Sequence, residues 1–304
     1  MSLILLTGSS GFVGLNLKKK FIKLGYEVIY PTSNELNLLS KSNTINYFKK
    51  KNPDFVVHLA GFSGGIEYMK LNPASIFDKN NLINSNLFNA CLEGKVYKVL
   101  LLNSINVYSS NVDLPFSEED IFNGEPDESV SSYALTKKNV LYYSKFYNEQ
   151  FGLNTLNLIC DNIYGPLDNF DKKKSRVIPA NIVKIHQAKK NLKTVINCWG
   201  SGDSIRSFIH IDDVCNAIIH FLDSTFESEI INISNKKLIS IKDLINKICL
   251  IMNYKGDLNW DISKPEGLSR RYMDLKKMVK YKFNPQIDID SGLKQTIKWY
   301  ENFG

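Results

Sequence analysis

Several features are scarce in this sequence of 304 residues, and each scarcity excludes a class of protein. No stretch of about 18 apolar residues occurs, so we expect no membrane-spanning helix. The apolar N-terminal segment lacks the charged beginning of a signal peptide and continues directly into a glycine-rich turn. These features favour a cytoplasmic protein whose first residues form a buried strand.

Cysteine is too sparse and too irregularly spaced to build a framework. The five cysteines are Cys91, Cys160, Cys198, Cys215 and Cys249. No Cys-x-x-Cys pair or Cys/His spacing indicates zinc, and an odd number of cysteines argues against a set of disulfides. We therefore predict buried thiols, a reducing compartment and no bound metal.

Arginine is rare beside lysine, although the net charge is +7. The lysines are dispersed, their short runs are typical of solvated faces and loops, and no RNA-binding motif occurs, so we expect no nucleic-acid partner. The four arginines are Arg176, Arg206, Arg270 and Arg271. A planar guanidinium can bind phosphate or carboxylate through two parallel hydrogen bonds. The arginines are therefore candidates for ligand binding, with ordinary surface ion pairs as the alternative.

Strand-like and helix-like segments alternate through the first half of the chain. The strand-like apolar runs are 3–7, 27–30, 54–59, 98–102 and 154–160. The helical segments between them are 12–24, 41–51, 73–93 and 131–149. This alternation predicts the α/β class, with a Rossmann-like, doubly wound parallel sheet.

Beyond Asn162 the alternation becomes irregular. The segments that follow are a loop at 165–175, a helix at 177–190, a strand at 193–199 and a helix at 211–223. We expect a smaller, mixed α/β C-terminal substrate domain in this part of the chain. Residues 1–162, with returns near 205–225, are then assigned to the first domain, and residues 163–304 mostly to the second.

The first strand-like run ends in a glycine motif, Gly8-Ser9-Ser10-Gly11-Phe12-Val13-Gly14, that also opens the first helix. Its first glycine allows a tight turn, its second lets the backbone approach a pyrophosphate, and its third lets the helix pack on the strand. The helix N-terminus adds free amides and a positive dipole end. The motif predicts an NAD(P) site that includes Gly8, Ser10, Gly11, Phe12, Val13 and Gly14.

The end of the second strand distinguishes the two dinucleotides. NAD-binding proteins usually carry a carboxylate there, which binds the ribose 2′-hydroxyl. In this chain the segment Tyr30-Pro31-Thr32-Ser33-Asn34 contains no acid before Glu35, and it contains no arginine that could bind a 2′-phosphate. NADP(H) is therefore favoured over NAD(H), without being decided.

A Tyr-x-x-x-Lys motif, formed by Tyr133 and Lys137, lies near the start of the long helix at 131–149. Residues four apart share one helix face, and a nearby ammonium stabilises a phenolate. Free tyrosine titrates near pH 10, so proton transfer near neutral pH requires about 4 kcal/mol of differential stabilisation. Ser104, after the fourth strand-like run, can hydrogen-bond the same substrate oxygen. The three residues predict a proton-transfer site that faces a nicotinamide.

These motifs together resemble those of the extended short-chain dehydrogenases. The residues that carry this likeness are the glycine motif, His58-Leu59-Ala60-Gly61, the set Ser104, Tyr133 and Lys137, and Asn162-Ile163-Tyr164-Gly165-Pro166. The segments that resemble GDP-L-fucose synthases are Asn34–Leu39, Gly64–Ile66, Leu167–Phe170, Val177–Ala180, Trp199–Gly202, Arg206–Asp213 and Lys264–Arg271. The resemblance covers nearly the whole chain.

The resemblance implies an NAD(P)H-dependent enzyme that acts on the sugar of a GDP-linked nucleotide-sugar, as a homodimer with helices at 84–93 and 131–149 in its interface. The residues it adds to the cofactor site are Asn37, Leu38, Leu59, Ala60, Gly61, Asn80 and Ile163. The residues it places in the substrate site are Ser63, Gly64, Asn106, Asn162, Arg176, Val177, Trp199, Arg206 and Arg270. Arg206 and Arg270 are expected beside the GDP pyrophosphate.

Two positions depart from the family pattern. GDP-L-fucose synthases epimerise C3 and C5 of a 4-keto sugar before they reduce C4, and they use a cysteine and a histidine as the acid/base pair. Asn106 and Arg176 stand at those two positions here. An amide cannot remove a carbon-bound proton, and a guanidinium keeps its proton at neutral pH. We therefore expect NADPH-dependent C4 reduction of a 6-deoxyhexose or heptose without epimerisation, in surface polysaccharide biosynthesis.

Other activities remain open from the residues alone. A bifunctional GDP-L-fucose synthase would need another base, and His186 and His210 are present, although His210 lies in an apolar segment typical of a core. A 4,6-dehydratase is disfavoured because Ile105 and Asn106 stand where such enzymes carry acids, and a C4 epimerase because no acid directly follows the second strand. A non-catalytic nucleotide-binding protein of this fold is disfavoured because the Tyr-x-x-x-Lys pair is kept.

Overall fold

The arrangement of the chain is given by a computed structural model. It describes residues 2–64, 66–171, 175–224, 228–263 and 268–303. The lysine run at 172–174, and residues 65 and 264–267 of the segments that resemble GDP-L-fucose synthases, lie outside the described residues. All other residues that the sequence predicts for the site fall within the described part.

The main sheet contains six parallel strands in the order β2-β1-β3-β4-β5-β9. The strands are β1 (Ile4–Thr7), β2 (Val28–Ile29), β3 (Phe55–His58), β4 (Lys98–Ser104), β5 (Asn154–Cys160) and β9 (Glu229–Ile233). From β1 the chain passes to β2 on one side and then to β3 on the other, so the winding reverses between β1 and β3. Ligands of such sheets bind beyond the carboxyl ends of the strands at this reversal.

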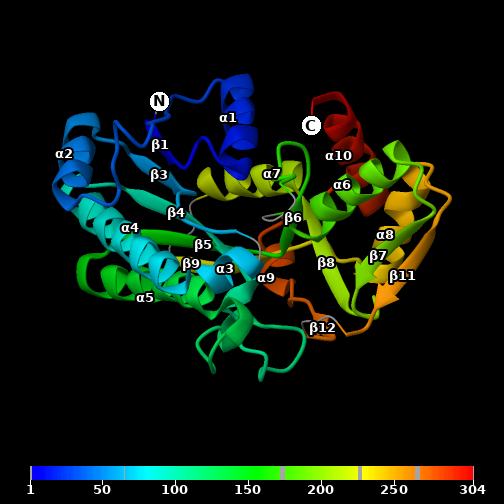
Figure 1. Ribbon diagram of the computed structural model, residues 1–304. Helices are drawn as coiled ribbons and strands as arrows, with labels where there is room; N and C mark the ends of the chain where they lie inside the picture. Colours follow the sequence, from blue (N-terminus) through cyan, green and yellow to red (C-terminus); the bar gives the residue numbers. More distant parts are fainter. Residues whose placement is uncertain (1, 65, 172–174, 225–227, 264–267, 304) are drawn as a thin grey trace.

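Helices cover both faces of the main sheet (Figure 1). One face carries α1 (Phe12–Leu24) and α7 (Ile211–Leu222), which share an apolar core with the strands. The other face carries α2 (Lys41–Lys51), α4 (Pro73–Glu93) and α5 (Ser131–Phe151). Because both faces are covered, the strands are continuous apolar runs. The predicted doubly wound α/β sheet is confirmed.

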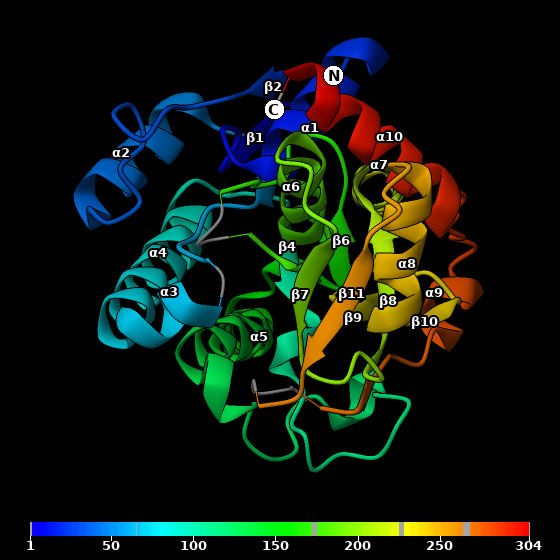
Figure 2. The same cartoon turned by 45° about the vertical axis from the view of Figure 1, so that its right-hand side comes forward.

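A second group of elements lies beside the main sheet (Figure 2). Its strands are β6 (Asn162–Tyr164), β7 (Val195–Trp199), β8 (Ile205–His210), β10 (Leu238–Ser240), β11 (Asp257–Asp261) and β12 (Arg270–Arg271). Its helices are α6 (Val177–Lys190), α8 (Ile241–Ile251) and α10 (Ile289–Phe303), which share an apolar core of their own. β8 pairs with β6, β10 and β12, whereas α7 packs against α1 and β9 joins the main sheet.

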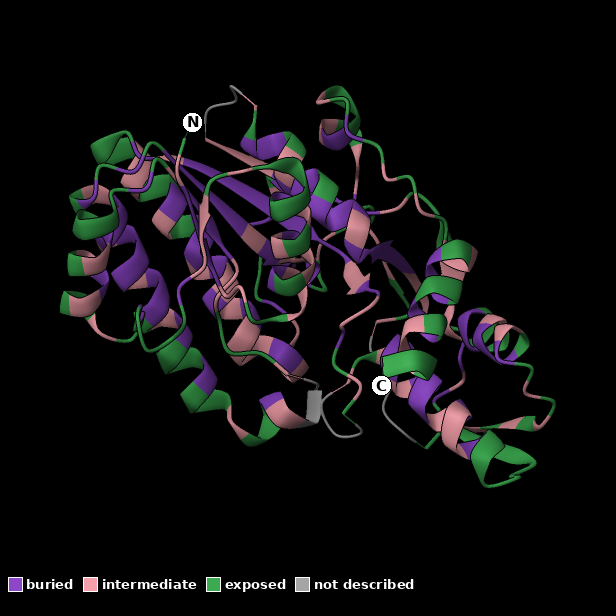
Figure 3. Ribbon diagram, turned by 90° about the horizontal axis from the view of Figure 1, so that it is seen from above, coloured by how far each residue is buried: buried purple, intermediate pink, exposed green. Residues whose placement is uncertain are grey.

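Short helical elements and buried side chains complete the fold. The short elements are α3 (Ile66–Leu71), η1 (Ile105–Val107), η2 (Glu118–Asp120), η3 (Glu128–Val130) and α9 (Lys276–Lys280). Burial is greatest in the main sheet and on the inner faces of its helices (Figure 3). All five cysteines are buried free thiols, as predicted. Within the described chain, no helix combines the length and apolarity needed to cross a bilayer.

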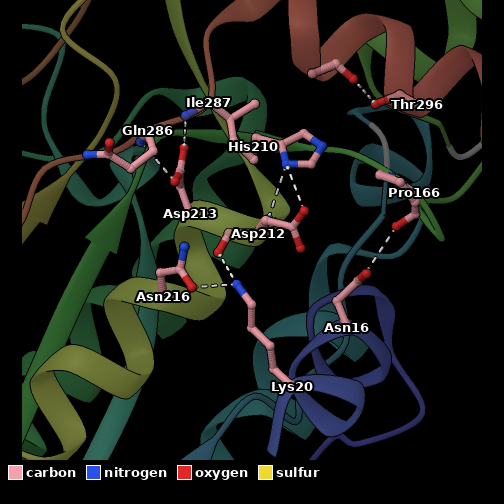
Figure 4. A network of polar contacts seen from close by, with 11 residues as sticks. Asn16, Lys20, Pro166, His210, Asp212, Asp213, Asn216, Gln286, Ile287 and Thr296 are labelled. Carbon is pink, nitrogen blue, oxygen red and sulfur yellow. Dashed lines mark hydrogen bonds and ion pairs between the residues drawn. The ribbon is translucent and has the colours of Figure 1, made fainter. Parts of the chain in front are cut away.

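Polar contacts join α1 to α7 and to the loop after β6, and α7 to the end of β8 (Figure 4). Lys20 Nζ of α1 donates a hydrogen bond to the Asp212 carbonyl of α7 at 2.8 Å. Asn16 Nδ2 of α1 donates to the Pro166 carbonyl, just after β6, at 3.0 Å. The ring of His210, at the end of β8, accepts a hydrogen bond from the Asp212 amide and so caps α7. These bonds hold β8 and the loop after β6 close to the glycine motif.

Candidate active site

The glycine motif forms the turn between β1 and α1, at the point where the winding of the sheet reverses. Gly8 has a φ of +70°, in the left-handed region, and a Cβ there would lie 2.6 Å from the Ala60 amide nitrogen, just beyond β3. A Cβ on Gly14 would lie 2.2 Å from the Gly8 carbonyl oxygen. Both positions therefore exclude a side chain, and the turn packs directly against the backbone after β3.

The N-terminus of α1 is suited to an anion. Gly11 is the N-cap residue, and no side chain caps this helix. Both Ser10 and Gly11 are exposed, while Phe12 and Val13 of α1 and Ile163 of β6 pack against the adjacent core. The first amides of a helix have no intrahelical partner and lie at the positive end of its dipole. The residues present therefore fit the pyrophosphate of a dinucleotide.

The remaining predicted cofactor residues continue from the ends of β3 and β2. Asn80 of α4 holds the segment after β3, because its side chain accepts a hydrogen bond from the Phe62 amide at 2.7 Å and donates to the Phe62 carbonyl at 2.9 Å. Directly before Phe62 lie Leu59, Ala60 and Gly61, which follow β3. These three residues therefore form the backbone segment that lies against the glycine turn.

The segment after β2 holds its first carboxylate in a local turn. Glu35 accepts hydrogen bonds from the Thr32 amide at 2.8 Å and the Thr32 hydroxyl at 2.9 Å, and these bonds lower the pKa of Glu35. Asn37 and Leu38 come next, and the Leu38 carbonyl accepts a hydrogen bond from Asn86 of α4 at 2.8 Å. The acid nearest to the predicted ribose position is thus engaged with the turn itself.

Two hydrogen bonds fasten α5 to the carboxyl end of β4. Lys137 Nζ donates to the Leu102 carbonyl at 3.0 Å, and Asn103 Nδ2 donates to the Lys137 carbonyl at 3.0 Å. Ser104 is the last residue of β4, and the Lys137 ammonium lies 5.9 Å from the centre of the Tyr133 ring on α5. The three predicted catalytic residues therefore lie at the same edge of the sheet as the glycine turn.

Burial governs the ionisation of the tyrosine and lysine. It raises the pKa of Tyr133 to about 12, although the charge of Arg176 acts in the opposite direction, and it lowers the pKa of Lys137 to about 8. In the protein alone, loss of water therefore disfavours the phenolate more than the charge of Arg176 favours it. Tyr133 stays protonated at physiological pH and is suited to donating a proton.

Asn106, at the first departure from the family pattern, lies in η1, two residues after Ser104. Ser104 Oγ accepts a hydrogen bond from the Asn106 amide at 3.3 Å. The side-chain oxygen of Asn106 accepts one from Arg271 Nη1 at 2.7 Å, and Arg271 Nη2 lies 3.5 Å from Asn162 Oδ1. The structure therefore brings Asn106 and Asn162 together through Arg271, the neighbour of the arginine that the sequence assigned to the substrate site.

Arg176, at the second departure, forms an ion pair. Its Nη2 lies 2.9 Å from Asp168 Oδ1, and the carboxylate is buried while the guanidinium is half exposed. The guanidinium carbon lies 5.5 Å from the centre of the Phe12 ring on α1. Val177 follows as the first residue of α6. The charge of Arg176 is thus held between the loop after β6 and the predicted cofactor helix, close enough to influence Tyr133.

The other two predicted arginines have different surroundings. Arg206 of β8 donates hydrogen bonds to the carbonyls of Ile205 and Leu268. Arg270 of β12 is exposed and lines a cavity of about 800 Å³ together with residues of β10, α8 and α10, among them Lys247. None of the three predicted catalytic residues lines that cavity.

Three further predicted substrate residues lie on exposed or irregular backbone. Trp199, at the end of β7, has 67% of its surface exposed. Ser63 and Gly64 lie between β3 and α3, and a Cβ on Gly64 would meet the Tyr68 ring at 2.5 Å. None of these three residues hydrogen-bonds to the predicted catalytic set in the part of the chain that the structure describes.

The structure places three further charged residues, which were not assigned to the cofactor or substrate site from the sequence, around Asn106, Asn162 and Arg176. Arg271 contacts Asn106, Asp168 pairs with Arg176, and Asp161 lies buried beneath Asn162. The rarity of arginine did single out Arg271 as a candidate for ligand binding. The two acids carried no such signal, because aspartate is common in this chain and their partners are distant or irregularly spaced in sequence.

Comparison with known proteins identifies the family. A model of the NAD dependent epimerase/dehydratase family matches residues 4–234. The chain belongs to this family. Among its relatives in the epimerase/dehydratase family, Probable GDP-L-fucose synthase 1 of Oryza sativa subsp. japonica is 31% identical, over 98% of this chain and 91% of the relative.

Two solved structures from Campylobacter jejuni show the same fold as this epimerase/dehydratase family member. A GDP-6-OMe-4-keto-L-xylo-heptose reductase is 26% identical, with a TM-score of 0.91, over 100% of this chain and 98% of its own. A GDP-mannoheptose C4 reductase with NADP bound is 26% identical, with a TM-score of 0.88, over 99% of this chain and 98% of its own. The protein is an NAD(P)-dependent oxidoreductase with the extended short-chain dehydrogenase fold.

Proposed function

We propose that this enzyme catalyses the NADPH-dependent reduction of C4 in a GDP-linked 4-keto sugar, a 6-deoxyhexose or a heptose, without epimerisation at C3 or C5. The observation that carries the proposal is the combination of Ser104, Tyr133 and Lys137 at one sheet edge with Asn106 and Arg176 beside them. The names of similar proteins, a GDP-L-fucose synthase and two GDP-heptose reductases, support the substrate class.

Tyr133 is the proton donor in this reaction. Burial keeps its hydroxyl protonated, and an alkoxide is a stronger base than a phenolate, so the C4 oxygen takes the proton once hydride has reached C4. A bound nicotinamide supplies that hydride. Ser104 donates a second hydrogen bond to the C4 oxygen. Lys137, fastened to the Leu102 carbonyl, stabilises the phenolate that remains.

Neither Asn106 nor Arg176, the two residues that depart from the family pattern, can remove a proton from carbon. The Asn106 amide is neutral, and its oxygen is already bound by Arg271. The Arg176 guanidinium keeps its proton and is paired with Asp168. The C3 and C5 configurations of the ketone should therefore pass unchanged into the product.

The two histidines that could replace the missing base are engaged elsewhere. His210 is buried, accepts a hydrogen bond from the Asp212 amide and lies 5.4 Å from the Tyr164 ring. His186 of α6 lies edge-on to Tyr300 of α10 at 5.4 Å. Both rings pack beside the apolar core of the second group, which supports the absence of a substitute base.

The cofactor and the GDP portion are assigned from the surroundings of the glycine turn and from β8. No acid precedes Glu35 in the segment after β2, and one carboxylate oxygen of Glu35 is held in the local turn by Thr32, which favours NADPH. Arg206 of β8 is the residue that we expect to bind the GDP pyrophosphate.

We assign residues 1–162, with the returns of α7 and β9, to the cofactor domain and most of 163–304 to the GDP-sugar domain.

We further propose a cytoplasmic homodimer that acts in surface polysaccharide biosynthesis. Helices α4 and α5 pack side by side, and α5 exposes the rings of Tyr142, Phe146 and Phe151. An exposed apolar strip on one of two adjacent long helices suits a four-helix interface between two copies. Light scattering at micromolar concentration tests this assembly, and a monomer would contradict it.

Deuterium exchange tests the proposed reaction. The protein is incubated in D₂O with a GDP-4-keto-sugar and NADP⁺, so that no hydride moves. We expect no deuterium at C3 or C5 beyond the enzyme-free control. With NADPH in place of NADP⁺, the absorbance of the reduced nicotinamide should fall, and the C4 alcohol should keep the C3 and C5 configurations of the ketone. Enzyme-dependent exchange at either carbon would instead indicate a bifunctional GDP-L-fucose synthase.

A further inference from the structure

One arginine reaches the candidate active site from the second group of elements. Arg271 of β12 pairs in register with Arg206 of β8, so the sheet fixes its backbone. Its Nη1 donates a hydrogen bond to Asn106 Oδ1 at 2.7 Å, and its Nη2 lies 3.5 Å from Asn162 Oδ1. Its Nε is buried and has no hydrogen-bond partner in the described chain. The guanidinium thus joins two asparagines that come from different elements, η1 and β6.

The asparagine on β6 is held rigidly. Asn162 Nδ2 donates to Asp161 Oδ1 at 2.7 Å and to the Ser207 carbonyl at 3.0 Å. The Asp161 carboxylate is buried, and its other oxygen accepts hydrogen bonds from the hydroxyls of Ser207 and Ser234. The NH₂ group of Asn162 therefore faces the acid and its oxygen faces Arg271, so one end of the guanidinium has a fixed acceptor.

The same guanidinium decides how the Asn106 amide is oriented. Arginine only donates hydrogen bonds, so the oxygen of Asn106 must face Arg271, and the NH₂ group must point away from it. That NH₂ group has no hydrogen-bond partner among the residues that the structure describes. The Asn106 backbone amide is bound to Ser104 Oγ at 3.3 Å. The residue that carries this free donor is thus two positions after Ser104, the serine that contacts the C4 oxygen in the proposed reaction, and its backbone is bound to that serine.

We propose that Arg271 is a positioning residue that makes Asn106 a hydrogen-bond donor to the C3 hydroxyl of the sugar. This rests on the proposed function, because the C3 hydroxyl is identified by its place next to the reacting C4 carbonyl. In a 4-keto pyranose the oxygen on C5 is the ring atom, so C3 is the neighbour that offers a hydroxyl. A donor at this point orients the ketone toward Tyr133 and favours sugars that keep the C3 hydroxyl.

Calorimetry with GDP and with GDP-mannose tests the proposal without any reduction. GDP-mannose carries hydroxyls at C3 and C4 and cannot be reduced, so the ratio of the two dissociation constants isolates the sugar. In Asn106→Ala and in Arg271→Lys, the Kd for GDP divided by the Kd for GDP-mannose should fall about three- to tenfold, the range of one neutral hydrogen bond. The Kd for GDP itself should stay within about twofold. The double variant should show no further loss, because Arg271 acts through Asn106.

Several outcomes would overturn this role. A loss of GDP affinity in Arg271→Lys as large as the loss of GDP-mannose affinity would show that Arg271 binds the diphosphate. Additive losses in the double variant would show that the two residues act independently. A wild-type enzyme that binds GDP and GDP-mannose equally would show that no sugar contact exists to be positioned.

The variant Asn106→Asp tests whether the Asn106 side chain donates a hydrogen bond to the sugar or only accepts one from Arg271. The carboxylate keeps an acceptor for Arg271 but has no N–H, so it should lose the sugar contribution as Asn106→Ala does, with an unchanged melting temperature. Retention of the sugar contribution in Asn106→Asp would overturn the proposal. These measurements report binding alone. If the single and double variants lose the same GDP-mannose affinity but the enzyme reduces no GDP-4-keto-sugar, the positioning role of Arg271 stands and the proposed function fails. If the enzyme reduces the GDP-4-keto-sugar but the losses of the two residues are independent, the proposed function stands and the positioning role fails.

Discussion

The two sides of the candidate active site are held by different kinds of contact. On the reducing side (Ser104, Tyr133 and Lys137), α5 is fastened to β4 by hydrogen bonds to main-chain carbonyls. On the substituted side (Asn106 and Arg176), each side chain is held by a charged side chain instead. On the reducing side the acceptors are main-chain carbonyls, which any residue supplies, whereas on the substituted side both partners are side chains. In the proposed reaction, the first set of contacts serves reduction at C4, and the second set surrounds the residues that would decide what happens at C3 and C5.

The largest expected effect lies on the reducing side. Tyr133→Phe removes the proton donor and should lower kcat by at least about a hundredfold, since proton transfer contributes roughly 10²–10⁴. Binding of the nucleotides should change little, because the ring is kept. Tyr142→Phe, on the exposed part of the same helix, is the matched control and should keep its activity. Initial rates of reduced-nicotinamide consumption measure both, and a kcat near wild type in Tyr133→Phe would remove the assigned role.

The substituted side can be changed toward the family pattern. Asn106→Cys together with Arg176→His restores the two residue types that the resemblance assigns to epimerisation. Because this double variant leaves the contacts between α5 and β4 unchanged, it should still reduce C4. It should also exchange deuterium at C3 or C5 at least about tenfold faster than the wild type, since a positioned base then becomes available. Exchange as slow as in the wild type would show that more than these two residues separates the activities.

Arg206 tests whether substrate binding can be changed separately from the reducing side. Arg206→Ala should raise KM for the GDP-sugar by about tenfold, a loss of about 1.4 kcal/mol, because a charge-assisted contact to the pyrophosphate is removed. The KM for NADPH should remain nearly unchanged. Steady-state kinetics with each substrate varied in turn gives both values. Equal weakening of both ligands would mean that Arg206, which also bonds the Ile205 and Leu268 carbonyls, is structural.

Local patterns predicted the main sheet and the glycine turn, because strands buried on both faces and a turn that excludes side chains leave direct traces in sequence. The surroundings of the site were less predictable. Strand β12 has only two residues, Arg270 and Arg271, so no alternation indicated which of them contacts the site. The burial that raises the pKa of Tyr133 left no trace in the sequence, because it depends on packing between segments. Asp168 went unnoticed because its role depends on the loop that brings it to Arg176.

The smallest expected effect is the pH dependence of kcat/KM. It distinguishes the ammonium of Lys137 on the reducing side from the guanidinium of Arg176 on the substituted side. Burial lowers the pKa of Lys137 to about 8, so its ammonium is present below that pH and is lost as pH rises through it. If the charged form is required, kcat/KM for NADPH, which reports the free enzyme, should be halved near pH 8 and fall about tenfold per further pH unit. Guanidinium groups in proteins do not lose a proton near pH 8. Arg176→Gln should therefore keep the alkaline limb at a lower rate, whereas Lys137→Arg should remove it. A limb that persists in Lys137→Arg would assign the titration to another group.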